Sequence, residues 1–143
     1  MDYLKVLVEE IHSVVVATVD ETGHPHTAVM DMMWEDGKTV YFLTADFKPI
    51  YKRLKEDGRV AVTGMTQGAG TMDRKSISLT GQVEWIGKEH LEELLKANPY
   101  MYEIYPTEEG RSHLQVFRFK NSVGNFYDLT QLPPYQARFE IEG

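Results

Sequence analysis

The alternation of apolar and polar residues along the chain predicts mostly β-strands. Ser13–Asp20 contains a run of valines, which is typical of a buried strand. His26–Trp34 and Val40–Leu43 continue with β-branched, aromatic and large apolar side chains, which favour strands. Between them, Glu35–Lys38 contains the Asp-Gly pair of a tight hairpin turn. We therefore expect these three strands to form an antiparallel meander.

Three segments have the apolar spacing of short helices instead. The first is the N-terminal segment 1–12, with apolar residues three or four positions apart. The second follows Val40–Leu43, where Asp46 can cap the helix, Pro49 fits its first turn and Gly58 can end it. The third is Lys88–Ala97, which ends before an Asn-Pro pair.

The later strands are separated by glycine-rich or polar segments. We place them at Arg59–Thr66, Lys75–Ile86, His113–Lys120 and Asn125–Leu129. In Lys75–Ile86, strict alternation predicts that Trp85 shares the apolar face of the strand. Asn121–Gly124 is expected to be a turn, and residues 130–143 a C-terminal tail.

This order of elements predicts a mainly β protein with short helices, of the α+β class. About six or seven strands that mostly neighbour one another in sequence favour a small β-barrel or curled antiparallel sheet. They argue against a doubly wound fold. A length of 143 residues is typical of one domain, so we expect a single domain over 1–143.

The composition of the chain excludes several classes of function. The net charge of −7 argues against binding to nucleic acid or to an anionic membrane surface, which requires a basic face. The chain has no cysteine, which excludes disulfides, thiolate metal ligands and a cysteine nucleophile. No apolar run reaches the length of a membrane span, and no signal-peptide pattern is present at the N-terminus. We therefore expect a soluble cytoplasmic protein.

The second helix carries the clearest candidate for ligand binding. Lys48, Lys52, Arg53 and Lys55 lie close to its N-terminal end, where a helix attracts anions. These residues can hold a phosphate, or they can form a solvated helix face.

Other chemical candidates leave alternatives open. Asp31 within an apolar strand either has buried partners or faces water. His24 and His26 lack a third ligand nearby, so we interpret them as polar residues and expect no metal site. Met30 and its neighbouring methionines fit a core or a dimer interface. No nucleophile, carboxylate pair or other catalytic constellation is recognisable, and no catalytic residue is assigned.

The order of several stretches carries a family resemblance. In chain order these stretches are HTAVMD, YFLT, LKEDGRVAV, SISLTGQVEWI and HLQVFRFK. Together they resemble the pyridoxamine 5'-phosphate oxidase-like family, the FMN-binding split barrels, over about Tyr3 to Leu129. The resemblance implies a six-stranded antiparallel split β-barrel that forms a homodimer, with FMN in clefts between the subunits.

The resemblance also implies the residues that hold the cofactor. They are His26, Val29, Met30, Asp31, Leu43, Thr44, Lys48, Tyr51 and Ser76. His26–Asp31 matches the strand that lines the flavin ring and reaches the phosphate, and Lys48 matches the phosphate lysine. His26 and Asp31 stand where the oxidase itself has basic residues. The oxidase's substrate-binding C-terminal segment has no match here, so oxidation of pyridoxamine phosphate is not expected.

The resulting hypothesis is an FMN-dependent oxidoreductase, of flavin reductase or small-molecule reductase type, that acts as a homodimer. A flavin performs the redox step itself, which agrees with the lack of a catalytic constellation. NAD(P)H or a small-molecule substrate would be its partner. The alternative is a non-catalytic flavin- or haem-binding module for sensing, storage or electron transfer. A third hypothesis is an interaction domain without a chromophore.

Overall fold

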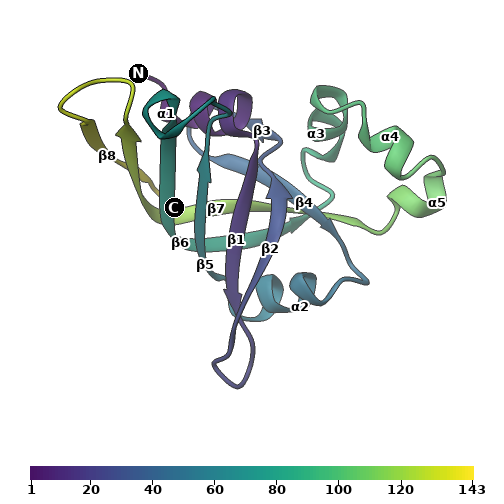
Figure 1. Cartoon of the computed structure of the whole chain (residues 1–143). Helices are drawn as coiled ribbons and strands as arrows, with labels where there is room; N and C mark the ends of the chain where they lie inside the picture. The colour runs from purple at the N-terminus through teal and green to yellow at the C-terminus, as the bar shows by residue number, and fades with distance from the viewer.

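Eight strands form one antiparallel sheet in the computed structural model, which describes residues 1–143 (Figure 1). In chain order they are β1 (Ser13–Val19), β2 (Pro25–Asp31), β3 (Trp34–Glu35), β4 (Val40–Ala45), β5 (Arg59–Met65), β6 (Lys75–Gly87), β7 (Leu114–Asp128) and β8 (Tyr135–Ile141). The order across the sheet is β2-β1-β5-β6-β7-β4-β3, and β8 also pairs with β7. The sheet curls into a half-barrel, which confirms the predicted fold class with eight strands instead of six.

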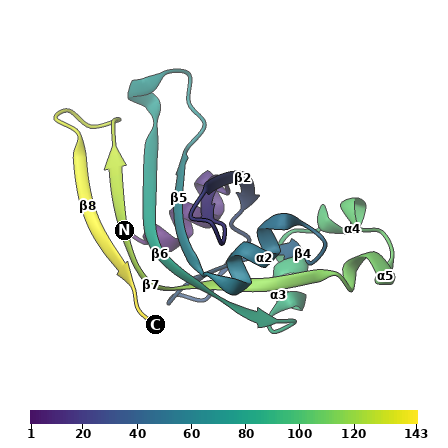
Figure 2. The same cartoon turned by 90° about the horizontal axis from the view of Figure 1, so that it is seen from below.

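The strand β7 extends through both halves of the sheet. Its first part pairs with β4, from Ala45↔Leu114 to Tyr41↔Arg118, and its last part pairs with β8, from Ser122↔Ile141 to Asp128↔Tyr135. β6 pairs along the other edge of β7. Figure 2 shows β7 bending from the side of β8 toward α5 (Glu108–Arg111).

The predicted turn at Asn121–Gly124 is therefore wrong. Asn121 does adopt a positive φ of 47°, but β6 and β8 hold the flanking residues in the ladder, so the chain bends without reversing. The expected tail contains β8, because its apolar residues can cover β7. Trp85 follows Val83 in unbroken β6–β7 register, so it keeps the predicted face of the strand, but near the end of β6 its side chain is 43% exposed.

The helices are short and lie around the sheet. They are α1 (Tyr3–Lys5), the π-helix η1 (Val6–Ile11), α2 (Pro49–Glu56), the 3₁₀-helix η2 (Thr71–Asp73), α3 (Leu91–Ala97), α4 (Met101–Ile104) and α5. α3, α4 and α5 gather on the side opposite β8, and α2 lies near the loop that joins β1 and β2 (Figure 1). None of the helices combines the length and apolar character required to cross a bilayer.

The start of α2 differs from the prediction in one respect. Pro49 is the first helical residue and Gly58 has a φ of 78°, as expected, but Lys48 occupies the capping position instead of Asp46. The carboxylate of Asp46 lies 2.9 Å from Nδ1 of His113. The N-terminus of α2 is therefore not blocked by a carboxylate of its own chain.

The strand β4 separates two apolar clusters. Val40 and Phe42 belong to the larger cluster of 19 buried residues inside the curled sheet. Tyr41, Leu43 and Ala45 point the other way, into a cluster of nine buried residues shared with α3 and α4. All residues of β4 are buried, so both faces of the strand stabilise the fold. β4 therefore gives one wall of the site described next a rigid support.

Candidate functional site

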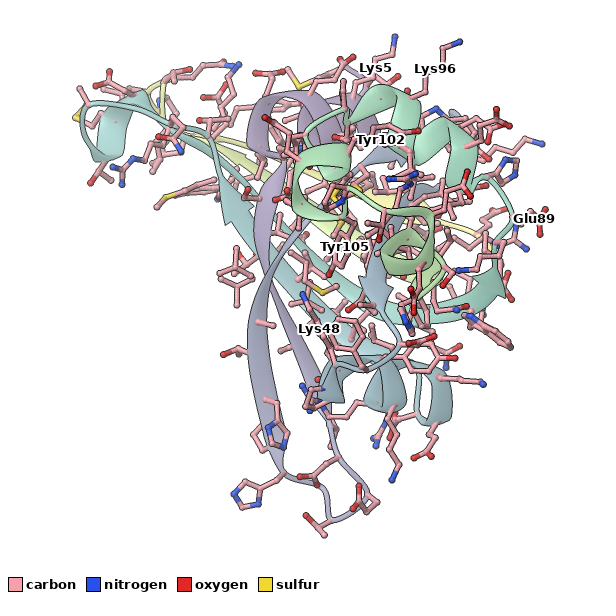
Figure 3. All side chains as sticks on the ribbon, turned by 90° about the vertical axis from the view of Figure 1, so that its right-hand side faces the viewer. Lys5, Lys48, Glu89, Lys96, Tyr102 and Tyr105 are labelled. Carbon is pink, nitrogen blue, oxygen red and sulfur yellow. The ribbon has the colours of Figure 1, made fainter.

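A cavity of about 260 Å³ opens between β2, β4 and the segment of α4. We name it the β2–β4 pocket; eight of its 11 lining residues are hydrophobic. They are Val29, Met30, Asp31, Met33, Leu43, Thr44, Ala45, Lys48, Met101, Ile104 and Tyr105. In Figure 3, Lys48 and Tyr105 lie on the same side of the molecule, where α2 and the segment 101–111 face each other.

The pocket brings together six of the nine residues that the sequence assigned to a cofactor. These are Val29, Met30, Asp31, Leu43, Thr44 and Lys48. Segments 29–31 and 43–48 do not pair with each other in the sheet, and the curl of the sheet brings them to one cavity.

The other three predicted residues lie elsewhere. His26 pairs with Thr18 near the β1–β2 turn, and its Nε2 is 2.8 Å from the Asp20 carboxylate. This contact, with hydrogen bonds from Thr22 and His24, lowers the pKa of Asp20 below its ordinary value. No group of three or more potential metal ligands forms, around His24 and His26 or elsewhere.

Tyr51 and Ser76 are also outside the pocket. Tyr51 packs against the larger core, with its ring 6.1 Å from that of Phe117. Ser76 pairs with Met65 and Tyr127 in the sheet. Neither Tyr51 nor Ser76 therefore lines the β2–β4 pocket of its own chain.

Lys48 is the cationic side chain of the pocket. Its backbone is extended, with φ −85° and ψ 143°, because it is the residue that precedes Pro49. It forms no salt bridge within the chain. Its ammonium group is therefore available to an anion near the start of α2.

Asp31 is the anionic side chain of the pocket, and its oxygens have partners. The hydroxyl of Ser13 donates to Oδ1 over 2.7 Å, and that of Tyr100 lies 2.8 Å from Oδ2. Burial, followed by the contact with Asp31, raises the pKa of Tyr100 above its ordinary value. The alternative that Asp31 only faces water is therefore wrong.

His12 stands behind this pair and was not assigned a role from the sequence. Its Nε2 is 2.8 Å from the hydroxyl of Tyr100, and its Nδ1 is 3.1 Å from the carbonyl of Val8. The backbone of His12 has φ 63° and ψ −66°, a strained conformation that costs about 1–3 kcal/mol in non-glycine residues. The backbone at the end of η1 is therefore held in an unfavourable conformation, while both ring nitrogens of His12 have partners.

The apolar wall of the pocket also contains residues that the sequence did not single out as binding residues: Met33, Ala45, Met101, Ile104 and Tyr105. Asn98 fixes part of this wall. Its buried amide nitrogen donates to the carbonyl of Met33 at 2.9 Å and to that of Leu94 at 2.8 Å. The side chain of Asn98 thus connects the end of α3 to the backbone of Met33, a residue of the pocket.

The curled sheet and the pocket at its edge define a protein of the split-barrel class. A family model described as pyridoxamine 5'-phosphate oxidase matches residues 2–127. The chain belongs to this family, as the resemblance predicted. No curated protein matches the chain.

Solved structures agree on the fold. A NimC/NimA family protein from Clostridium acetobutylicum has a TM-score of 0.74 and 19% identity, over 97% of this chain and 93% of that one. A heme binding protein from Mycobacterium smegmatis has a TM-score of 0.73 and 13% identity, over 97% and 57%. A FAD-binding protein from Mesorhizobium loti has a TM-score of 0.64 and 16% identity, over 84% and 88%.

Proposed function

We propose that this protein binds FMN in the β2–β4 pocket and acts as a homodimeric oxidoreductase of flavin reductase or small-molecule reductase type. The observation that carries the proposal is the composition of the pocket. An unpaired lysine and a threonine lie beside a wall of methionine, leucine and tyrosine side chains. Such a wall suits a flat aromatic ring, and the lysine suits a phosphate.

The polar and apolar groups of the pocket match the two ends of FMN. The ammonium of Lys48 and the hydroxyl of Thr44 would hold the phosphate and the ribityl chain. Met33, Met101 and Ile104 would contact the ring system. A bound flavin would supply the redox chemistry, while the protein binds it and excludes water.

The homodimer is supported by the outer face of the sheet. Two rows of paired residues cross four strands there without a charged residue: Val29–Val15–Thr63–Ser78 and Thr27–Ala17–Ala61–Thr80. Charged residues make up 26% of the chain, so an exposed uncharged surface of this extent is a candidate interface.

This face continues into the β2–β4 pocket. Val29, which is 74% exposed, belongs to the first row and also lines the pocket. A second copy on this face would therefore cover the open side of the pocket. The cavity of about 260 Å³ is smaller than most sites for cofactor-sized ligands, about 300–1,000 Å³, so the proposed site needs a second wall.

Haem is the alternative ligand, since the Mycobacterium smegmatis neighbour is named a heme binding protein. Haem iron requires an axial ligand such as histidine, methionine or tyrosine. The residues that line the pocket include no histidine. Haem would thus depend on a methionine or on Tyr105, whereas FMN can use the phosphate site at Lys48, and we favour FMN.

The first experiment records the visible spectrum of the purified protein through gel filtration with light scattering, before and after FMN is added. A flavin band that elutes with the dimer supports the proposal. Oxidation of NADPH, followed at 340 nm with a panel of acceptors, then tests turnover. A haem band, or a protein without any chromophore and without FMN affinity, refutes the proposed cofactor.

Lys48→Ala tests the phosphate contact directly. Loss of a hydrogen bond between charged groups costs about 1.5–3 kcal/mol, so the dissociation constant of FMN should rise about 10- to 150-fold. The matched control is Lys52→Ala, which removes the same charge from α2 at a residue outside the pocket. Equal affinities of the two variants would contradict the role of Lys48.

A further inference from the structure

A second cavity lies behind the β2–β4 pocket and shares the Met33 wall with it. It has a volume of about 510 Å³, and we name it the His12 cavity. His12 lines it together with the carboxylate residues Glu9 and Glu35. The charged and titratable residues that line the β2–β4 pocket are Asp31, Lys48 and Tyr105.

A chain of hydrogen bonds connects the two cavities. His12, from the His12 cavity, contacts the Tyr100 hydroxyl through Nε2 at 2.8 Å. The same hydroxyl lies 2.8 Å from Oδ2 of Asp31, in the β2–β4 pocket. Nε2 of His12 and Oδ2 of Asp31 are 3.5 Å apart. Tyr100 thus bridges groups that belong to different cavities.

The hydrogens in this chain can be counted, because each group has a fixed number of donors. The carbonyl of Val8 only accepts, so Nδ1 of His12 carries a hydrogen. If the single hydrogen of Tyr100 goes to Asp31, Nε2 of His12 must carry a hydrogen too. If it goes to Nε2, Asp31 must be protonated. Both arrangements hold one proton more than a neutral histidine with an ionised aspartate.

We propose that His12, Tyr100 and Asp31 form a proton relay between the His12 cavity and the β2–β4 pocket, an inference that rests on the proposed redox function of that pocket. In one transfer, the Nε2–H bond of His12 breaks and its proton binds the oxygen of Tyr100. The original Tyr100 O–H bond breaks and that proton binds Oδ2 of Asp31. The charges of His12 and Asp31 are both cancelled, and Tyr100 is neutral before and after.

The relay would serve a need that the apolar pocket creates. Reduction of a small molecule by hydride transfer also requires a proton at the accepting molecule. Most of the pocket lining is hydrophobic, and Asp31 is the carboxyl group within it. Within one chain the side chains of His12 and Asp31 are 31% and 28% exposed. A flavin and a second copy over the β2–β4 pocket would cover Asp31, whereas solvent would still reach His12 through the His12 cavity. Tyr100 and His12 act through Asp31, as positioning residues.

The first test needs no flavin. Long-range ¹H–¹⁵N spectra of the histidine rings in the protein without cofactor should show His12 with a hydrogen on Nδ1. In Asp31→Asn, which no longer needs the extra proton, the ¹⁵N shift of Nε2 should move toward that of an unprotonated nitrogen. A hydrogen on Nε2 alone, or an Nε2 shift that does not respond to Asp31→Asn, overturns the relay.

The second test uses the protein loaded with FMN. Tyr100→Phe breaks the chain, so the single-turnover rate of substrate reduction should fall at least about tenfold and change its pH profile, with FMN affinity within threefold of the original. Tyr102→Phe is the control, since it makes the same change at an exposed tyrosine of α4 (Figure 3). Equal rates of the two variants overturn the relay.

The two tests separate failure of the relay from failure of the proposed function. A protein that binds no flavin refutes the proposed function, and the histidine spectra then decide the relay by themselves. A protein that binds flavin and turns over, but shows equal rates for Tyr100→Phe and Tyr102→Phe, retains its function and loses the relay.

Discussion

Replacement of Asn98 by alanine should destabilise the protein by about 1–3 kcal/mol. The amide of Asn98, which is 4% exposed, donates two hydrogen bonds, to Met33 and to Leu94. Each contributes about 0.5–1.5 kcal/mol, and the buried carbonyls would lose this donor. The backbone N–H of Asn98 cannot replace it at Leu94, because it already donates to Leu95.

The assay is urea unfolding of the wild type, Asn98→Ala and Asn98→Asp, followed by circular dichroism. The aspartate has the same shape but presents only acceptors to two carbonyls, so Asn98→Asp should be less stable than Asn98→Ala. Because Asn98 holds Met33, both variants should also weaken FMN binding if the proposed site is correct. A loss below about 0.5 kcal/mol in Asn98→Ala, or an aspartate as stable as the alanine, would refute this reasoning.

Two further predictions concern other parts of the sheet. In Gly124→Ala, the new Cβ would lie 2.2 Å from the ring of Phe139. The packing of β8 on β7 should therefore be disturbed, and the free energy of unfolding should fall by about 1–3 kcal/mol. A urea double-mutant cycle with Phe139→Ala should recover part of this loss, and additive effects would contradict the clash. The side chain of Arg59 lowers the pKa of Asp57 to about 2 in the folded protein. The ionised carboxylate of Asp57 therefore stabilises the folded protein above the unfolded pKa of about 3.9, and this stabilisation is lost as the pH falls toward 2. The stability difference between wild type and Asp57→Asn should shrink between pH 5 and pH 2, and a constant difference would exclude this linkage.

The fold was predictable because its signals are local. Runs of valine, strict alternation and an Asp-Gly turn placed β1, β2, β4, β5 and β6 close to their observed positions. The short strand β3 was missed, because the expected strand His26–Trp34 ends at Asp31. The expected meander was also wrong, because β4 pairs with β3 and β7 and not with β2. The turn predicted at Asn121–Gly124 was wrong because residues typical of a turn can also occupy a bend within a strand. Only the pairing partners distinguish a bend from a turn. Those partners are β6, which lies more than 30 residues earlier in the chain, and β8, whose alternating residues Tyr135–Ile141 were assigned to the tail.

The candidate site was predictable only in part. The residues of β2 and β4 that line the pocket had been assigned through the family resemblance alone. Met101 and Ile104 reach the pocket through the packing of α4, which no spacing in the sequence specifies. His12 and Asp31 are 19 residues apart and Tyr100 lies 69 residues beyond Asp31, so their contact depends on the tertiary structure.

The late position of β7 in the chain has a consequence for protein synthesis. β4 ends at Ala45, and its long-range partner begins with Leu114, 69 residues later. Ribosomes add about 5–20 residues per second, so the apolar β4 waits about 3–14 s for the strand that covers its edge. During this interval the nascent chain exposes a strand that the finished protein buries on both faces. Slower translation between β4 and β7 would lengthen this interval.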